Sequence, residues 1–109
     1  MSDRQILLAS GDIPGGIDAL ARAFTLVPTD AALAFRVAKI AFENQIEPER
    51  TVEFAECAVA LEEESTEYRK LLGMVYKFAG RADEARRELQ RVWELDPLDK
   101  EVKAALLGL

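Results

Sequence analysis

The sequence repeats itself at an interval of about 34 residues, and this repetition restricts the possible fold more than any other feature. Residues 66–97 contain two amphipathic stretches, separated by Gly80 and closed by Pro97, with apolar residues at spacings of three and four. A shift by 34 and then 35 residues aligns this segment with two earlier ones, pairing Leu95 with Leu61 and Leu26, Val92 with Ala58 and Ala23, Leu89 with Ala55 and Leu20, and Tyr76 with Phe42 and Leu7. We expect these aligned positions to be buried. One helical hairpin cannot bury its own apolar faces, so the period predicts an all-α fold, an α-solenoid of stacked antiparallel hairpins.

The best-preserved copy also resembles a known family, the tetratricopeptide repeat (TPR). The residues that match its pattern are Leu72-Gly73, Tyr76, Gly80, Ala85 and Leu95-Asp96-Pro97. Residues 32–65 depart from the pattern, with Lys39 at a Gly position, Thr51 at an Ala position and Glu63 at the closing Pro position. Residues 1–29 match it at Gly11, Leu20, Ala23, Leu26 and Pro28. The resemblance implies a binding role without naming a ligand.

We therefore expect a single domain over residues 1–109, with repeats at about 1–30, 31–65 and 66–98 and a capping helix over 99–108. The first helix, over residues 3–9, is short. Helix starts are indicated by Pro14 and Pro48 and by the N-cap residues Thr29 or Asp30, Ser65 or Thr66, and Asp99.

Composition excludes several classes of function. The net charge of −6 disfavours binding to nucleic acid or to an anionic membrane surface. No apolar run approaches the roughly 20 residues of a membrane span, and the apolar segment near the start is too short for a secretory signal. The single cysteine, Cys57, allows no internal disulfide, and we expect it to be buried and inert in a cytoplasmic protein.

Catalysis is also disfavoured by the residues present. The chain has no histidine, which removes the usual general base near neutral pH and the commonest metal ligand. It has no Gly-rich phosphate loop and no cysteine cluster for a metal. We expect a protein that is not an enzyme and binds no cofactor.

In the tetratricopeptide family, the first helix of each repeat lines a concave groove. By that resemblance the groove residues here are Leu33, Arg36, Ile40, Glu43, Lys70, Met74 and Lys77, with Glu67 at the rim and Glu101 and Ala104 continuing the wall. The first helices are rich in Lys and Arg and the helix over 48–62 is rich in Glu, so we expect a basic groove and an acidic outer face. The predicted function is a non-catalytic protein–protein interaction module, whose groove holds a protein or peptide segment, for which an acidic one is a candidate.

Three alternatives stay open. The charged residues of the groove can be solvated surface without a ligand. The chain can self-associate as a homodimer through its terminal helices, using Leu107 and Leu109, or serve as one module of a larger scaffold protein. The family's carboxylate clamp for chaperone C-termini is disfavoured, because Leu71 and Ile40 stand where clamp proteins tend to have Asn.

Overall fold

The computed structural model of the chain describes residues 13–109, and within this range it contains six helices and no strand. The short helix predicted over residues 3–9, with its end at Gly11, lies outside the described residues. The helices are α2 (Ile13–Leu26), α3 (Ala31–Glu43), α4 (Pro48–Leu61), α5 (Thr66–Phe78), α6 (Ala82–Leu95) and α7 (Lys100–Leu107). The predicted all-α fold is confirmed.

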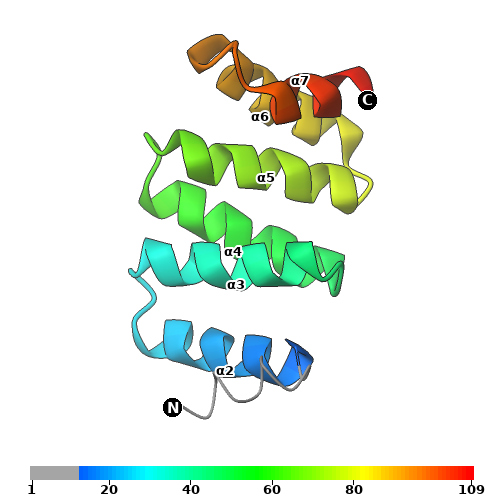
Figure 1. Ribbon diagram of the computed structural model, residues 1–109. Helices are drawn as coiled ribbons and strands as arrows, with labels where there is room; N and C mark the ends of the chain where they lie inside the picture. The colour runs from blue at the N-terminus through cyan, green and yellow to red at the C-terminus, as the bar shows by residue number, and fades with distance from the viewer. Residues whose placement is uncertain (1–12) are drawn as a thin grey trace.

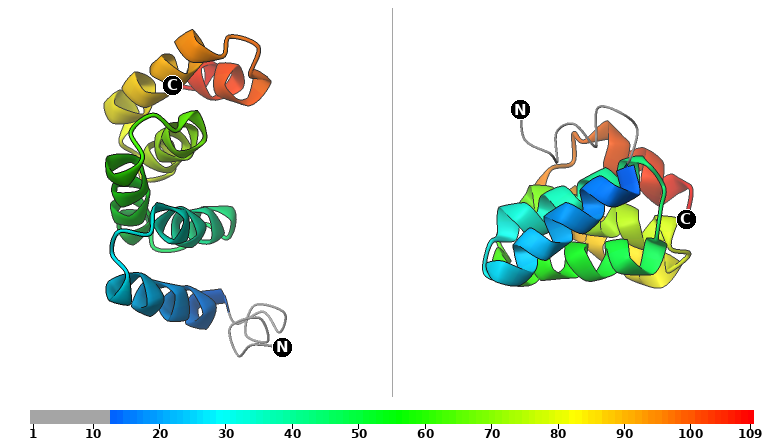
Figure 2. Two further views of the ribbon diagram at one scale, coloured as in Figure 1. Left: turned by 90° about the vertical axis from the view of Figure 1, so that its left-hand side faces the viewer. Right: turned by 90° about the horizontal axis from the view of Figure 1, so that it is seen from below.

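The helices stack into a curved array (Figures 1 and 2). Each packs on the next along the chain, and α3 also contacts α5. In the left view of Figure 2, α4 and α6 lie on the outer, convex side, and α3, α5 and α7 lie on the inner, concave side. Figure 1 shows that α3 and α5 run in the same direction, so the start of one lies beside the start of the other.

The core consists of three apolar clusters that follow one another along the array. The first joins α2 to α3 through Ile17, Leu20, Val37 and Ala41. The second fills the space among α3, α4, α5 and α6, and the third joins α6 to α7 through Leu89, Val92, Val102 and Ala105. A succession of small cores is typical of solenoids, in which each hairpin is stabilised by its neighbours.

The helix starts follow the capping residues that the sequence indicates. Asp30, Ser65 and Asp99 accept hydrogen bonds from the backbone N–H groups of Leu33, Tyr68 and Val102, at 3.1, 3.2 and 3.1 Å. Each bond satisfies a donor that the first turn of a helix leaves free. Between α5 and α6, Gly80 has a φ of +78°, the left-handed conformation that glycine adopts without strain.

Thr51, in α4, stands where the tetratricopeptide-repeat pattern has alanine, and it stabilises the preceding turn. It is buried, and its Oγ1 lies 3.0 Å from the carbonyl oxygen of Ile46 and 2.9 Å from that of Glu47. Gln45 and Glu47 have φ values of 52° and 46°, which are unfavourable for residues other than glycine. The buried hydroxyl therefore stabilises a strained turn between α3 and α4.

The expectation that every aligned apolar position is buried is wrong for the leucine at the end of each repeat. Leu26, Leu61 and Leu95 expose 83%, 39% and 67% of their surface. Each is the last residue of its helix, α2, α4 and α6. The chain turns away at that point, so no neighbouring helix covers the side chain.

The expectation of a buried Cys57 is also wrong, because its side chain is exposed. The buried face of α4 is formed by Val52, Ala55, Ala58 and Val59. Cys57 follows Ala55 by two residues, about 200° around the helix, and therefore points outward. Partial burial, together with the negative charges of Glu56 and Glu53, raises the pKa of the thiol and disfavours the reactive thiolate.

Candidate functional site

A depression of about 380 Å³ lies between α3, α5 and α7, on the concave side of the array. We refer to it as the concave depression. Its lining residues are Phe35, Lys39, Phe42, Glu43, Glu67, Lys70, Leu71, Met74 and Glu101. The size falls within the range of ligand pockets in proteins, roughly 300–1,000 Å³.

The floor of the concave depression is apolar and held rigidly. Phe35 stacks on Tyr68 with ring centroids 4.7 Å apart, and Phe42 meets Phe78 edge to face at 6.0 Å. Phe35, Phe42 and Met74 are half-buried, so each packs on the core and still presents surface to solvent. These three side chains therefore form a continuous apolar surface that is partly open to solvent.

Lys70 lines the concave depression but is already paired. Its Nζ lies 2.8 Å from Asp99 Oδ2 and 3.5 Å from Glu101 Oε1. The hydrogen bond that Lys70 donates to Asp99 raises the pKa of Lys70, and the same bond lowers the pKa of Asp99. Because Asp99 is also the N-cap of α7, Lys70 connects α5 to the start of the last helix.

Lys77 connects α5 to the other end of the last helix. Its Nζ lies 3.3 Å from the carbonyl oxygen of Ala105, in the final turn of α7, where a positive charge is favourable to the helix dipole. Reversing the charge of Lys70 and Lys77 would therefore disturb the docking of α7 as well as the groove surface.

The structure brings together some of the predicted groove residues and separates others. Glu43, Lys70 and Met74 line the concave depression, together with Glu67 and Glu101, which were expected at the rim and along the wall. Leu33 and Ile40 instead pack against the cluster that joins α2 to α3. Arg36, Lys77 and Ala104 do not line it, and Arg36 is exposed without an ion pair to a described residue.

Four lining residues, Phe35, Lys39, Phe42 and Leu71, are absent from the groove that the sequence predicts. Phe35 and Phe42 have helical positions that match the buried stripe, and the spacing therefore predicts burial for them. The sizes of the side chains in α3 could have indicated their partial exposure. The helix is otherwise rich in alanine, and the two phenylalanine rings are larger than its neighbouring helices can cover completely.

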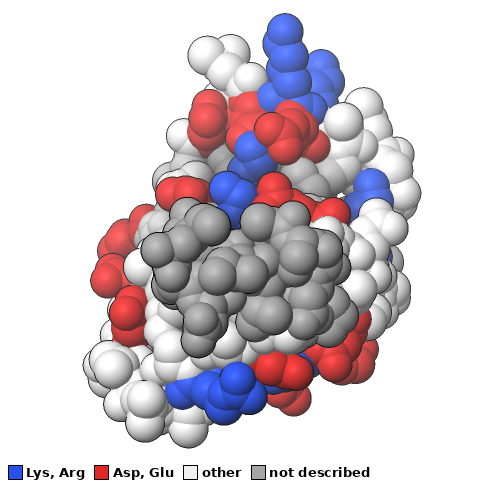
Figure 3. Space-filling view, turned by 60° about the horizontal axis from the view of Figure 1, so that its bottom comes forward, with Lys and Arg blue, Asp and Glu red and all other residues white. Residues whose placement is uncertain are grey.

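The expectation of a basic groove does not hold for the concave depression. Its lining contains three carboxylates, Glu43, Glu67 and Glu101, and two lysines, Lys39 and Lys70. The face of the molecule drawn in Figure 3 carries both acidic and basic side chains, scattered over it. The lining of the concave depression therefore contains more acidic than basic side chains.

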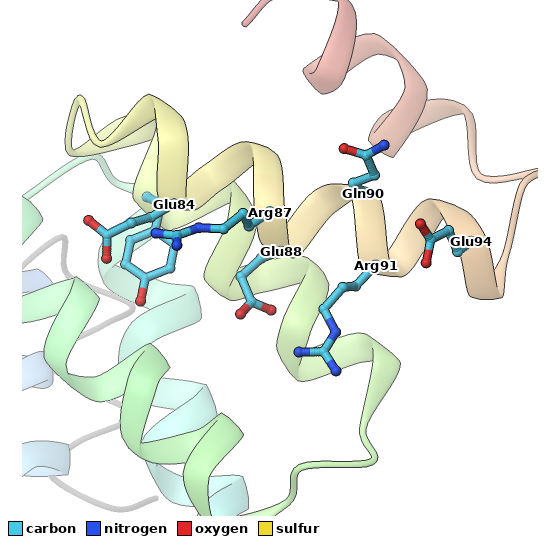
Figure 4. Close-up of a pocket in the computed structure, with 7 residues that line it drawn as sticks. Glu84, Arg87, Glu88, Gln90, Arg91 and Glu94 are labelled. Carbon is cyan, nitrogen blue, oxygen red and sulfur yellow. The ribbon is translucent and has the colours of Figure 1, made fainter.

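A second depression, of about 470 Å³, lies along the outer side of α6. It is lined by Tyr76, Glu84, Arg87, Glu88, Gln90, Arg91 and Glu94, six of which belong to α6 and are labelled in Figure 4. The Tyr76 hydroxyl donates a hydrogen bond of 2.6 Å to Glu56, and burial and this bond raise the pKa of Tyr76 far above its usual range. Arg69 and Glu88 form an ion pair at 3.2 Å. Although larger, this depression is lined mainly by charged and polar side chains, so we favour the concave one.

Within residues 13–109, no three His, Cys, Asp or Glu side chains are grouped as a metal site would require. None of the helices in the same range has both the length and the apolar character needed to cross a bilayer.

Comparison with models of known protein families finds no match, and no curated protein matches the sequence. Solved structures do match. The first TPR domain of Spaghetti (RPAP3), bound to the HSP90 peptide SRMEEVD, has a TM-score of 0.80 and 21% identity, over 96% of this chain and 82% of that one. The second TPR domain of human RPAP3, in complex with the HSP70 peptide SGPTIEEVD, has a TM-score of 0.80 and 19% identity, over 96% and 87% of the two chains.

A third similar structure is the crystal structure of MamA, with a TM-score of 0.83 and 21% identity. It matches 97% of this chain, which spans 61% of the MamA chain. These likenesses show that the chain has the tetratricopeptide-repeat fold, as its sequence pattern indicates.

Proposed function

We propose, starting from this tetratricopeptide-repeat fold, that the chain is a non-catalytic protein-interaction domain that binds a segment of a partner protein in the concave depression. The observation that supports this most strongly is the partly exposed apolar floor formed by Phe35, Phe42 and Met74 on the concave side. Aromatic and methionine side chains are enriched at protein interfaces, and charged residues at the rim favour a defined orientation of the partner.

The carboxylate-clamp mode of binding is not supported by the residues present. Leu71 is nearly covered at 9% exposure, and Ile40 packs towards α2. Neither side chain can donate a hydrogen bond to a terminal carboxylate, as the asparagines of a clamp would. The structure also gives less support to an acidic partner segment, which the sequence suggested. Lys70, one of the cations expected to bind it, is already paired with Asp99.

Peptide selection tests the proposal before the natural partner has been identified. A display library of random peptides is panned against the intact chain, and the enriched peptides are measured by fluorescence anisotropy against Met74→Glu. We expect this change to weaken binding by at least about tenfold, because it places a carboxylate on the apolar floor and loses roughly 1.4 kcal/mol or more of contact.

Two further variants separate loss of binding from loss of folding. Lys39→Trp changes an exposed residue at the edge of the concave depression, and the bulky ring should obstruct it while leaving the core intact. Ala60→Glu adds the same charge as Met74→Glu at an exposed position of α4 and should leave binding unchanged. Enriched peptides that bind Met74→Glu and Lys39→Trp as tightly as the parent would exclude the concave depression as the site.

Self-association is a second candidate, favoured by leucines exposed near the C-terminal end of the array. Leu95, Leu98 and Leu107 expose 67%, 87% and 79% of their surface. If these residues form a dimer contact, the sedimentation coefficient should rise over a hundredfold increase in concentration, and Leu98→Ser with Leu107→Ser should abolish the rise. A mass that stays monomeric over the whole range would leave the concave depression as the single proposed site.

A further inference from the structure

We infer that the segment bound in the concave depression is cationic as well as apolar, with Lys or Arg beside a large apolar side chain. This inference rests on the proposed function and adds the chemistry of the partner. It is the reverse of the charge expected from the sequence.

The first observation is that two carboxylates of the concave depression have no positive partner among the described residues. Neither Glu43 nor Glu67 forms an ion pair or a hydrogen bond through its side chain within residues 13–109. Glu43 is the last residue of α3, and Glu67 lies in the first turn of α5. Because α3 and α5 run in the same direction, these carboxylates lie towards opposite ends of the concave depression (Figure 1).

The second observation concerns the cations that line the same surface. Lys70 is balanced by Asp99 and Glu101, at 2.8 and 3.5 Å. Lys39 is then the one lining cation without an ion pair to a described residue, and its Nζ lies 5.8 Å from the centroid of the Phe35 ring. The negative face of an aromatic ring attracts a cation, so the Phe35 ring already interacts with Lys39 of the same chain.

Together these features give the concave depression an apolar floor and an excess of carboxylate. A partner segment with one large apolar side chain can fill the floor while a Lys or Arg on either side of it reaches Glu43 or Glu67. An acidic segment would place its carboxylates beside the same two residues and be repelled. The HSP90 and HSP70 peptides SRMEEVD and SGPTIEEVD, which bind the two RPAP3 domains, are therefore expected to bind this chain poorly.

The experiment compares the charge of the peptides enriched from the random library with that of the unselected library, and uses SRMEEVD and SGPTIEEVD as acidic probes. We expect enriched peptides to contain an excess of Lys and Arg and to lose affinity for Met74→Glu. Enriched peptides that are acidic yet still depend on Met74 would overturn the inference and leave the proposed function standing. Peptides indifferent to both Met74→Glu and Lys39→Trp, or no enrichment at all, would overturn the proposed function and the inference with it.

A charge-reversal variant tests the two carboxylates directly. Glu43→Lys combined with Glu67→Lys should weaken the binding of the enriched basic peptides on the order of tenfold, because two favourable charge pairs are replaced by repulsion. The pair of changes should alter stability little, because Lys is favourable at the end of α3 and unfavourable at the start of α5.

The matched control is Glu53→Lys with Glu62→Lys, two exposed residues in α4 and at its C-cap that lie outside the concave depression and form no ion pair with a described residue. It adds the same charge to the molecule and should retain most of the affinity. Equal losses in the two double variants would show that the overall charge, rather than the concave depression, selects basic peptides, and would overturn the inference.

Discussion

Replacing Gly73 by alanine should destabilise the protein by about 1 kcal/mol, although alanine is the better helix former. A Cβ atom at this position would lie 2.6 Å from both Cγ and Cδ2 of Leu89 and 3.3 Å from its backbone nitrogen. Leu89 is fully buried and cannot move aside. Overpacking of this kind costs about 1–3 kcal/mol, which exceeds the gain of roughly 1 kcal/mol in helix propensity.

The same change should become favourable once Leu89 is shortened. Leu89→Ala alone removes a fully buried side chain from the cluster between α6 and α7, which should cost about 3 kcal/mol. In that background the new methyl group of Gly73→Ala no longer meets the side-chain atoms Cγ and Cδ2 and has only the backbone nitrogen of residue 89, at 3.3 Å, as a close neighbour. Its helix propensity therefore remains as a gain of up to about 1 kcal/mol. Urea denaturation of the parent, the two single variants and the double variant measures this coupling.

Gly108→Ala provides the control for a glycine without a rigid neighbour. Gly108 has a φ of −86°, and the nearest atom to an added Cβ is the flexible Lys77 Nζ. Its replacement should change the free energy of unfolding by less than about 0.5 kcal/mol. If Gly73→Ala changes the free energy of unfolding equally with and without the Leu89 side chain, the close approach of α5 and α6 is not the reason that glycine is needed at position 73.

Asp99→Ala should produce the second large effect, a loss of roughly 2 kcal/mol concentrated in α7. The carboxylate caps α7 through Oδ1 and pairs with Lys70 through Oδ2, at 3.1 and 2.8 Å. Loss of an N-cap costs about 1 kcal/mol, and loss of a partly exposed ion pair up to about 1 kcal/mol. Hydrogen exchange at the capped Val102 amide, with urea denaturation of the whole chain, measures both the local and the global loss.

The contribution of Asp99 should depend on pH in a definite direction. Its folded pKa is lowered, chiefly by the hydrogen bond from Lys70, below the value of about 3.9 expected in the unfolded chain. The folded state therefore binds this proton less readily than the unfolded state. The stabilisation is fully present above that unfolded pKa and is lost as the pH falls through the folded pKa.

Asp99→Asn separates the two roles of the side chain. Asparagine is a good N-cap but cannot form the ion pair, so this variant should lose less stability than Asp99→Ala. It should also lose the pH dependence that the parent owes to this residue at pH values below the unfolded pKa of about 3.9. An Asp99→Asn protein with the acid sensitivity of the parent would attribute that sensitivity to other carboxylates.

Much of the fold could be predicted from residues close together in sequence. The N-caps at Asp30, Ser65 and Asp99 and the left-handed Gly80 follow from the conformations that these side chains favour locally. The period near 34 residues predicted stacked hairpins, because apolar faces that recur at a fixed interval must cover one another. The period failed to predict burial at the ends of the helices. Leu26 and Leu95 recur at the expected interval, but both are exposed.

The candidate site could be predicted only in part. Met74 and Glu43 were assigned to the groove and line the concave depression, while Ile40, with the same pattern, packs towards α2. Which half of a helix surface a neighbour covers depends on how far the two helices are apart and how they are rotated. The spacing of residues within one helix does not contain that information.

The sequence by itself determined the helices, their caps and their antiparallel stacking, because these depend on contacts within one hairpin or between identical faces of successive hairpins. Only the tertiary structure decided the charge of the concave depression. Lys70 counts as a free cation in the sequence, but folding places Asp99, 29 residues further along, 2.8 Å from its Nζ. An ion pair between residues that are distant in the chain neutralises a cation without leaving any pattern in the local sequence. The excess of carboxylate in the concave depression therefore became visible only once the fold had placed Asp99 beside Lys70.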